Sequence, residues 1–184
     1  MEKTFVALLR GINVGGHGLI PMKELKTVFE ELHFQSVRTY LQSGNVVFTS
    51  SQENAKMLPA VIEQAIASSF TCAATVIIRT PAQLAAAYAD NPFLKEHGID
   101  TGKLYMIFLS AIPDALELLT LKKYHYEPDR YIIAGDTVYC CYEQGAGKTR
   151  ITINIFERVL KVSATSRNLN TVKALSAQTV LKSL

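Results

Sequence analysis

The order strand, helix, hairpin, helix, strand occurs twice along this chain of 184 residues. Each copy has a hairpin, at residues 41–48 and at residues 132–139, in which a tight turn separates two apolar segments. The turns read Gly44-Asn45 and Gly135-Asp136, residue types that accept the positive φ angles of tight turns. A chain ordered in this way is expected to fold as two similar units.

Hydrophobic periodicity predicts the elements around the hairpins. In the first copy they are a strand at residues 5–9, a helix with Leu25, Val28, Phe29 and Leu32 on one face, a helix at residues 58–66 and a strand at residues 75–79. In the second copy they are a strand at residues 104–109, a helix from about residue 114, a helix from about residue 149 and a short strand near residues 163–166. Residues 151–155 also alternate like a strand, but the length of the segment favours a helix.

A βαββαβ unit closes most simply as a ferredoxin-like split sandwich, with four antiparallel strands and two helices on one face. The sequence therefore predicts an α+β fold of two tandem ferredoxin-like domains. We expect the first at residues 1–81, with an inserted glycine-rich loop, and the second at residues 82–184, with a basic C-terminal part. The boundary is placed at Pro81, which precedes an alanine-rich helix at residues 82–89.

The first copy is longer between its first strand and its hairpin. Phe5 and Gly44 are 39 residues apart, whereas Tyr105 and Gly135 are 30 residues apart. The additional residues coincide with a glycine-rich segment at residues 12–20. We interpret this segment as a loop that the first copy has gained.

Composition favours a cytoplasmic protein without a metal or cofactor. The first apolar run ends at Arg10, which is too early for a signal peptide or a membrane span. The three cysteines are an odd number, and Cys140 and Cys141 are adjacent on a predicted strand, so they point to opposite faces. We expect them to be small core residues in a reducing compartment. The four histidines are scattered, with no spacing typical of a metal site or an acid–base pair.

Positive charge is concentrated in the last fifth of the chain. Residues 144–184 contain one acidic residue, Glu157, and seven basic residues: Lys148, Arg150, Arg158, Lys161, Arg167, Lys173 and Lys182. The preceding part has twelve basic and fifteen acidic residues. Such a concentration indicates an anionic partner, and the alternative is an ordinary solvated helical surface.

Several motifs resemble those of the bacterial domain-of-unknown-function-1697 family. They are residues 10–16 (RGINVGG), Pro21-Met22, residues 40–48 (YLQSGNVVF), residues 91–93 (NPF), residues 135–139 (GDTVY) and residues 165–172 (TSRNLNTV). The resemblance covers nearly the whole chain and implies a pair of ferredoxin-like domains. Such proteins more typically have Trp where this chain has Leu169. The family is uncharacterised, so the resemblance implies no activity, cofactor or catalytic residue.

The expected topology gathers polar residues at one sheet edge of the first domain. The end of the first strand and the turn between the second and third strands should meet there. The residues concerned are Arg10, Asn13, Gly15, Gly16, Gln42, Ser43 and Asn45. A glycine loop that precedes a helix N-terminus presents free N–H groups to an anion, and an arginine adds a bidentate donor. The alternative is that the glycines only permit a tight loop and Arg10 bonds a carbonyl group.

In the second domain the opposite edge has the richer set of polar residues. Here we expect Lys148, Arg150, Arg167, Asn168 and Asn170 to form one basic surface, with Lys148 at a helix N-terminus. Gly147-Lys148-Thr149 is the tail of a P-loop, but Tyr142 occupies the position of the first P-loop glycine. A plain phosphate contact is therefore predicted instead of a nucleoside triphosphatase site.

These features favour binding of a phosphate-bearing ligand, either a nucleotide or a nucleic acid. Phe48 and Tyr139 stand at equivalent hairpin positions, and RNA-recognition motifs carry stacking aromatics on such strands. An enzyme acting on a small anionic metabolite at the Arg10 loop is one alternative. A structural role, with possible homo-oligomers, is another. No membrane partner is expected, and the residues give more weight to a binding protein than to an enzyme.

Overall fold

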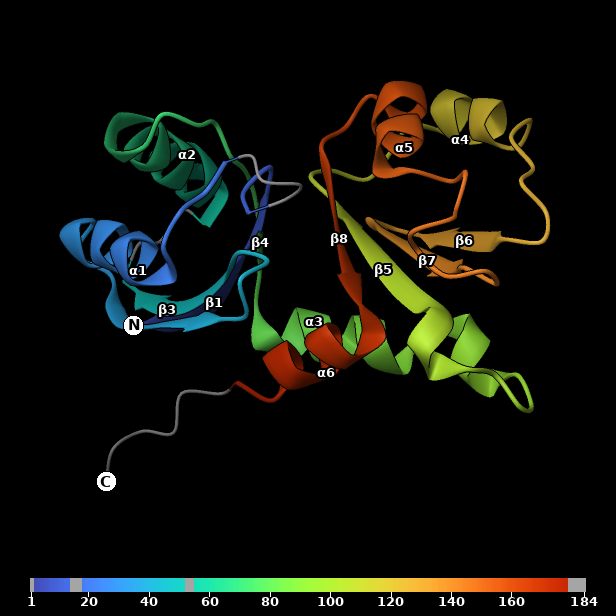
Figure 1. The fold of residues 1–184 in the computed structure, drawn as a ribbon, viewed down its shortest axis with the longest axis horizontal. Coiled ribbons are helices and arrows are strands. Elements are labelled where there is room, and N and C mark those ends of the chain that lie inside the picture. The colour runs from blue at the N-terminus through green and yellow to red at the C-terminus, as the bar shows by residue number, and fades with distance from the viewer. Residues whose placement is uncertain (1, 14–17, 52–54, 179–184) are drawn as a thin grey trace. The chain divides into compact units, whose positions relative to one another are not determined.

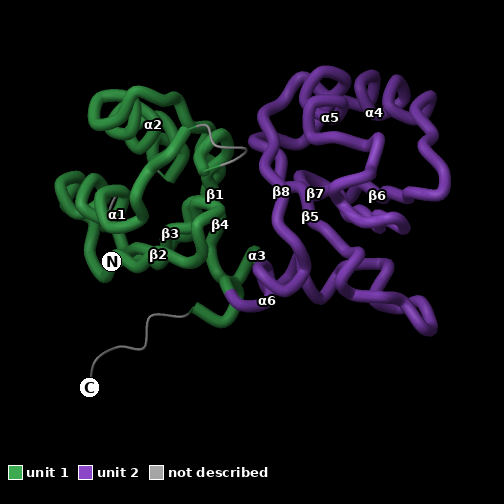
Figure 2. The backbone as a smooth tube through the Cα atoms, in the orientation of Figure 1, with its two compact units in different colours: residues 1–84, 175–184 green, residues 85–174 purple. Residues whose placement is uncertain are grey.

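The structure, a computed structural model, describes residues 2–13, 18–51 and 55–178 (Figure 1). The chain consists of two compact units, one formed by residues 1–84 and 175–184 and the other by residues 85–174 (Figure 2). Each unit contains a four-stranded antiparallel sheet with the strand order of a ferredoxin-like fold. The predicted α+β architecture of tandem ferredoxin-like split sandwiches is confirmed.

Unit 1 contains the sheet β2-β3-β1-β4, in which β1 pairs antiparallel with both β3 and β4. Its elements are β1 (Lys3–Arg10), α1 (Met22–Glu31), β2 (Gln35–Tyr40), β3 (Asn45–Ser50), η1 (Ala55–Met57), α2 (Leu58–Ser69) and β4 (Thr75–Arg79). The helix α3 (Pro81–Ala89) follows and continues into unit 2. In Figure 1, α1 and α2 lie on the same face of this sheet.

The core of unit 1 lies between this sheet face and the two helices. The Phe34 and Phe48 rings stack with centroids 4.5 Å apart, and Phe29 of α1 meets Phe48 edge-on at 5.4 Å. Ile62 and Ile66 of α2 are also buried in this cluster. The helical periodicity of the sequence therefore identifies the buried faces correctly.

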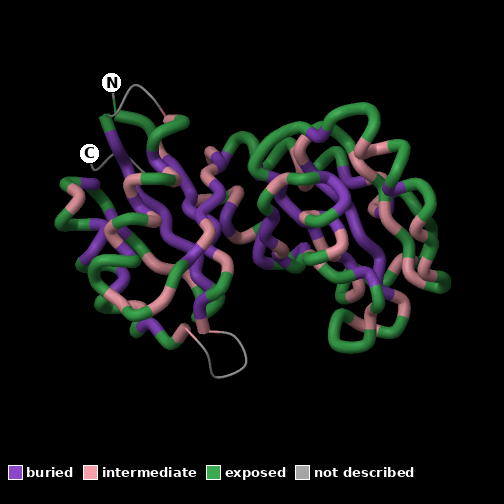
Figure 3. Tube along the Cα trace, turned by 90° about the horizontal axis from the view of Figure 1, so that it is seen from above, coloured by how far each residue is buried: buried purple, intermediate pink, exposed green. Residues whose placement is uncertain are grey.

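Unit 2 repeats the arrangement with the sheet β6-β7-β5-β8. Its elements are η2 (Pro92–Lys95), η3 (Thr101–Lys103), β5 (Leu104–Leu109), α4 (Ala115–Leu121), β6 (Arg130–Ala134), β7 (Thr137–Cys141), α5 (Ile153–Leu160), β8 (Ala164–Asn168) and α6 (Leu169–Ser176), the last of which ends in unit 1. The strands contain most of the buried residues, and the outer sides of the helices are exposed (Figure 3).

Two neighbouring cysteines face opposite sides of the second sheet, as the sequence predicts. Cys140 belongs to the core that includes Phe156 of α5, whereas the Cys141 thiol bonds Glu143 on the other side. Both are buried and unbridged, and burial raises the pKa of Cys140 to about 12. Within the described residues, no helix combines the length and apolar character needed to cross a membrane.

The two hairpins correspond with a shift of one residue from the predicted alignment. Leu9 N–H donates to the carbonyl oxygen of Gly44 at 2.8 Å, and Leu109 N–H donates to that of Asp136 at 2.9 Å. Gly44 is therefore equivalent to Asp136 and not to Gly135. The first turn is longer than predicted, since it spans residues 41–44 between β2 and β3. Leu41 and Gly44 both adopt positive φ there, and Asn45 is already paired with Leu8 in the sheet.

This shift places Phe48 and Tyr139 on opposite sheet faces, since side chains alternate along a strand. Phe48 packs in the core beneath the helices, and Tyr139 points to the other face. Their exposed fractions are 0% and 3%. Neither ring is available to stack on a base, so the comparison with RNA-recognition motifs is wrong at these positions.

Candidate anion-binding site

Asn13 joins the loop after β1 to the turn between β2 and β3. Its Nδ2 donates to the carbonyl oxygens of Ile20 and Gln42, both at 3.0 Å, and its Oδ1 accepts from Ile20 N–H at 2.8 Å. The predicted meeting of these two segments at one sheet edge is therefore observed. These three bonds join Asn13 to Ile20 and to the β2–β3 turn.

Asn45 stabilises the β2–β3 turn itself through hydrogen bonds of its side-chain amide. It is fully buried, and its Nδ2 donates to Tyr40 O at 2.8 Å and to Ser43 Oγ at 3.1 Å. Gly44 is required there, because a Cβ at this position would lie 2.8 Å from Ile12 Cδ1. The Gln42 and Ser43 side chains are the exposed polar groups of the turn, beside the exposed Leu41.

Arg10 ends β1 opposite Thr75 of β4 and is partly buried. Strand alternation puts it on the same face as Val6 and Leu8, whereas Leu9 points into the core beneath the helices. The loop glycines Gly15 and Gly16 lie outside the described residues. This first cluster therefore consists of two exposed polar side chains on a hydrogen-bonded turn, while Arg10 ends the neighbouring strand β1.

In unit 2, Lys148 and Arg150 are exposed but do not lie at a helix N-terminus. Lys148 N–H closes a turn onto Gly145 O at 3.0 Å, and α5 begins only at Ile153 after the N-cap Thr152. The predicted helix start near residue 149 is wrong. The Thr149 hydroxyl donates elsewhere, to Asp129 Oδ2 at 2.6 Å.

Arg167 is not part of an exposed basic surface, contrary to prediction. Only 6% of the residue is exposed, and its guanidinium donates to Thr165 Oγ1 at 2.8 Å and to Ser166 O at 2.7 Å. Burial lowers the pKa of Arg167 to about 10. Its position in β8 turns the side chain toward the sheet face that also carries Met106 of β5.

The residues after Arg167 form an N-cap and the start of a helix that the sequence analysis does not predict. Asn168 Oδ1 accepts from Thr171 N–H at 2.8 Å, which caps α6. Leu169 is buried, and Asn170 is exposed. A large side chain at position 169 would therefore serve packing rather than stacking on a ligand.

Asp129 is a residue that sequence reasoning misses, and it holds the loop that carries Lys148 and Arg150. Its Oδ1 accepts from Glu143 N–H at 2.9 Å, and its Oδ2 accepts from Thr149. One carboxylate thus ties both ends of the loop to the start of β6. The only local signal is Pro128-Asp129, which indicates a turn and nothing about a partner fourteen residues away.

A cavity of about 440 Å³ opens beside this carboxylate. It is lined by Lys122, His125, Tyr126, Glu127, Asp129, Arg130 and Tyr131. The Arg150 guanidinium lies 5.6 Å from the centroid of the Tyr126 ring, a cation–π distance. Among the described residues, Lys122, Lys148 and Arg150 make no ion pair.

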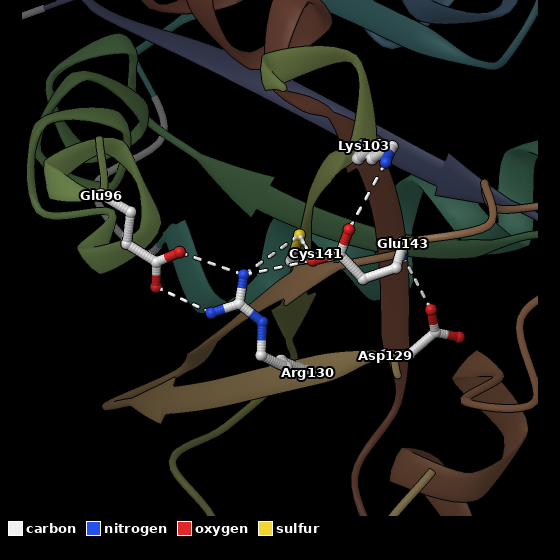
Figure 4. A network of polar contacts seen from close by, with 6 residues as sticks. All are labelled: Glu96, Lys103, Asp129, Arg130, Cys141 and Glu143. Carbon is white, nitrogen blue, oxygen red and sulfur yellow. Dashed lines mark hydrogen bonds and ion pairs between the residues drawn. The ribbon is translucent and has the colours of Figure 1, made fainter. Parts of the chain in front are cut away.

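Arg130 lines the cavity, and its charge is already balanced by two glutamates (Figure 4). Its guanidinium donates to both carboxylate oxygens of Glu96, at 2.9 and 3.0 Å, and to Glu143 at 3.2 Å. It also lies 5.1 Å from the Phe93 ring centroid. The bond to Glu96 raises the pKa of Arg130. Arg130 is therefore fixed in place and stays charged.

Glu143 links this network to Lys103 and to the loop. Its carboxylate accepts from the Cys141 thiol at 3.4 Å and pairs with Lys103 at 3.4 Å (Figure 4). The thiol bond, followed by the bonds from Arg130 and Lys103, holds the pKa of Glu143 below its ordinary value. No cluster of three potential metal-ligating side chains occurs in the part of the chain that the structure describes.

Comparisons with known proteins identify a family and a fold. The family model described as "Protein of unknown function (DUF1697)" matches residues 2–139. The solved structure of the conserved bacterial protein SP0830 from Streptococcus pneumoniae is similar, with a TM-score of 0.73 and 19% sequence identity. The match covers 96% of this chain and 98% of that protein. No curated protein matches the chain.

Proposed function

The chain belongs to the DUF1697 family of proteins of unknown function, and we propose that its second unit binds a small phosphate-bearing ligand, most simply a nucleotide. The ligand would occupy the cavity beside Asp129. The observation that carries the proposal is Arg150, an exposed residue that makes no ion pair among the described residues. Its guanidinium lies over the ring of Tyr126, which lines the cavity.

The size and chemistry of the cavity support a small ligand. Small-molecule sites usually have volumes of about 300–1,000 Å³, and this one has about 440 Å³. Arg150 and Lys122 can donate to phosphate oxygens, because neither forms an ion pair within the described residues. The tyrosine rings of the wall, Tyr126 and Tyr131, give an apolar surface for a base or sugar.

The loop that holds Arg150 over Tyr126, a residue of the cavity lining, is held in place before any ligand arrives. The Asp129 carboxylate bonds Thr149, the residue that directly precedes Arg150, and Glu143 at the beginning of the loop. A loop that is ordered in advance loses less conformational entropy on binding. The bidentate Arg130–Glu96 pair fixes another part of the wall in the same way.

A nucleotide is favoured over a nucleic acid. Stacking aromatics and a continuous basic surface are the usual features of single-strand binding. Here Phe48 and Tyr139 are buried, and Arg167 is removed from the surface. Lys148 and Arg150, two positions apart in the chain, remain exposed, and two charges suit one or two phosphate groups.

Isothermal titration with adenosine and guanosine mono-, di- and triphosphates, and with inorganic phosphate, tests the proposal. We expect nucleotides to bind, and we expect Arg150→Ala to weaken binding at least tenfold, about 1.4 kcal/mol. Arg38→Ala is the matched control, because Arg38 is an exposed arginine in β2 of unit 1. Absence of binding by the wild type, or equal affinity in the two variants, would contradict the proposal.

A second candidate function is an enzyme acting on a small anionic metabolite at the β1 edge of unit 1. It is favoured by the rigid turn that Asn13 and Asn45 build beneath the exposed Gln42 and Ser43. The same titration distinguishes the two sites. A metabolite bound at this edge would lose affinity in a Gln42→Ala variant and keep it in Arg150→Ala.

A further inference from the structure

The outer strand β6 of unit 2 is a regular sheet edge that is unusually open. It pairs with β7 without a register shift from Arg130 to Ala134, and none of its five residues is buried. Within the described residues, no strand pairs with its other side. It contains no Pro or bulge, and its one charged residue, Arg130, stands at its first position, so the features by which edge strands usually avoid pairing with another chain are few.

The other three sheet edges differ from β6. The edge strand β2 has a register shift between Gln35 and Arg38, and Ser36 adopts a φ of 51°. Such a bulge twists an edge away from partners. The edge strands β4 and β8 each have three buried residues among their five. An additional strand is therefore accommodated best at β6.

We propose that β6 pairs antiparallel with β6 of a second copy of this chain, about a two-fold axis at Ile132. A pairing centred there sets Ile132 opposite its own copy in the partner, Tyr131 opposite Ile133, and Arg130 opposite Ala134. The two four-stranded sheets of unit 2 then join as one eight-stranded sheet. Closed two-fold dimers with such self-complementary surfaces are the commonest homo-oligomers.

The side chains of β6 suit this register. The central Ile132 is 43% exposed, and its contact with the partner's copy removes apolar surface from water on both sides. The aromatic and β-branched pair of Tyr131 with Ile133 is a favourable cross-strand combination. No like charges face each other, because Arg130 stands opposite an alanine. Glu96 and Glu143 already balance its charge within its own copy.

Charge substitutions at position 132 give a sharp test, since the residue faces itself across the axis. Sedimentation velocity of the full chain, whose monomer has a mass of 20.3 kDa, should show a species of twice that mass. Ile132→Lys and Ile132→Glu should each be monomeric, because like charges stand directly opposite. An equimolar mixture of the two variants should recover the dimer, because opposite charges then meet.

Leu116→Lys is the control, because Leu116 is an apolar residue of α4 that is 71% exposed in the same unit. It should leave the dimer intact. Circular dichroism checks that each variant folds. A wild type that stays monomeric at hundreds of micromolar, or a dimer that persists in both position-132 variants, would overturn the proposal. So would a mixture of the two variants that remains monomeric. Nucleotide binding is measured separately: Ile132 does not line the cavity, whereas Arg130 and Tyr131 of the same strand do.

Discussion

Arg79 and Arg167 occupy the same position in the two sheets. Arg79 of β4 lies opposite Val6, and Arg167 of β8 lies opposite Met106. Val6 and Met106 are themselves equivalent, since each stands three residues before the leucine that bonds the hairpin turn. Both arginines are buried, and each donates to the carbonyl oxygen of its preceding residue, at 2.9 and 2.7 Å. The internal repeat therefore extends to a buried charged residue.

Replacing Arg167 by Ala should destabilise the protein markedly. The change leaves a cavity and removes the bonds to Thr165 and Ser166, so we expect a loss of about 2–4 kcal/mol in the free energy of unfolding. Lys148→Ala, at an exposed position, should cost less than about 1 kcal/mol. Urea unfolding measures both. Equal, small effects would show that Arg167 contributes no more than a surface charge.

Two glutamates, one in each unit, also make equivalent hydrogen bonds. Glu63 of α2 accepts from Val76 N–H at 2.7 Å, and Glu157 of α5 accepts from Ala164 N–H at 2.9 Å. Each ties a helix to the start of the last strand of its sheet. We expect Glu63→Ala and Glu157→Ala to lower stability by about 1–3 kcal/mol each, because a backbone N–H loses a charged acceptor.

The conservative variants Glu63→Gln and Glu157→Gln keep an acceptor oxygen and should cost less than the alanine variants. Urea unfolding of all four gives the comparison. An exposed helical glutamate, Glu24 in the first turn of α1, provides the control as Glu24→Ala. Effects at Glu63 and Glu157 no larger than at Glu24 would contradict a role for these bonds.

The sequence is sufficient to predict the elements whose signals are local. The predicted strands at residues 75–79 and 104–109 coincide with β4 and β5, because each is a run of apolar β-formers. The buried faces of α1 and α2 follow from their periodicity. Ferredoxin-like topology then brings the Asn13 loop to the β2–β3 turn, which the bond to Gln42 shows.

Features that depend on distant partners could not be read from the sequence. Thr149 is a plausible helix start by residue type, but its hydroxyl bonds Asp129, and the helix begins at Ile153. Arg167 looks like a surface charge until the register of β8 turns it to the buried face. The one-residue shift between the hairpins arises because Gly44 closes a longer turn than Gly135 does.

The Glu143 network should make stability depend on pH in the acidic range. The pKa of Glu143 in the folded protein lies below its ordinary value of 4.5, through bonds from Cys141, Arg130 and Lys103. A carboxylate with a lowered pKa contributes stability above its unfolded pKa and loses it as the pH falls through its folded pKa. The stability difference between wild type and Glu143→Gln should therefore shrink as the pH falls below about 4.5.

Urea unfolding from pH 3 to pH 7 measures this difference. Glu31→Gln serves as the control, because Glu31 is an exposed carboxylate at the end of α1. Its difference from wild type should stay small and nearly constant. A Glu143→Gln variant whose deficit does not change with pH would show that the ion pairs of the network contribute nothing to folding.

Asp129 should control both the order of the loop and the binding of a nucleotide. Asp129→Ala removes the acceptor for Glu143 N–H and for the Thr149 hydroxyl together, so residues 143–151 should lose protection from hydrogen exchange. Nucleotide affinity should fall about tenfold or more, because Arg150 is no longer held over the Tyr126 ring before the ligand arrives. Hydrogen exchange with mass spectrometry and isothermal titration measure the two effects.

Asp129→Asn should give an intermediate result, since its amide offers one acceptor oxygen in place of two. Asp100→Ala is the matched control: Asp100 also accepts a backbone bond in unit 2, from Gly102 N–H at 2.9 Å, but at the start of η3. It should leave nucleotide affinity unchanged. Unaltered exchange at Thr149 and Ile151 in Asp129→Ala would show that this carboxylate does not order the loop. Loop disorder without a loss of affinity would show that the ligand does not contact Arg150.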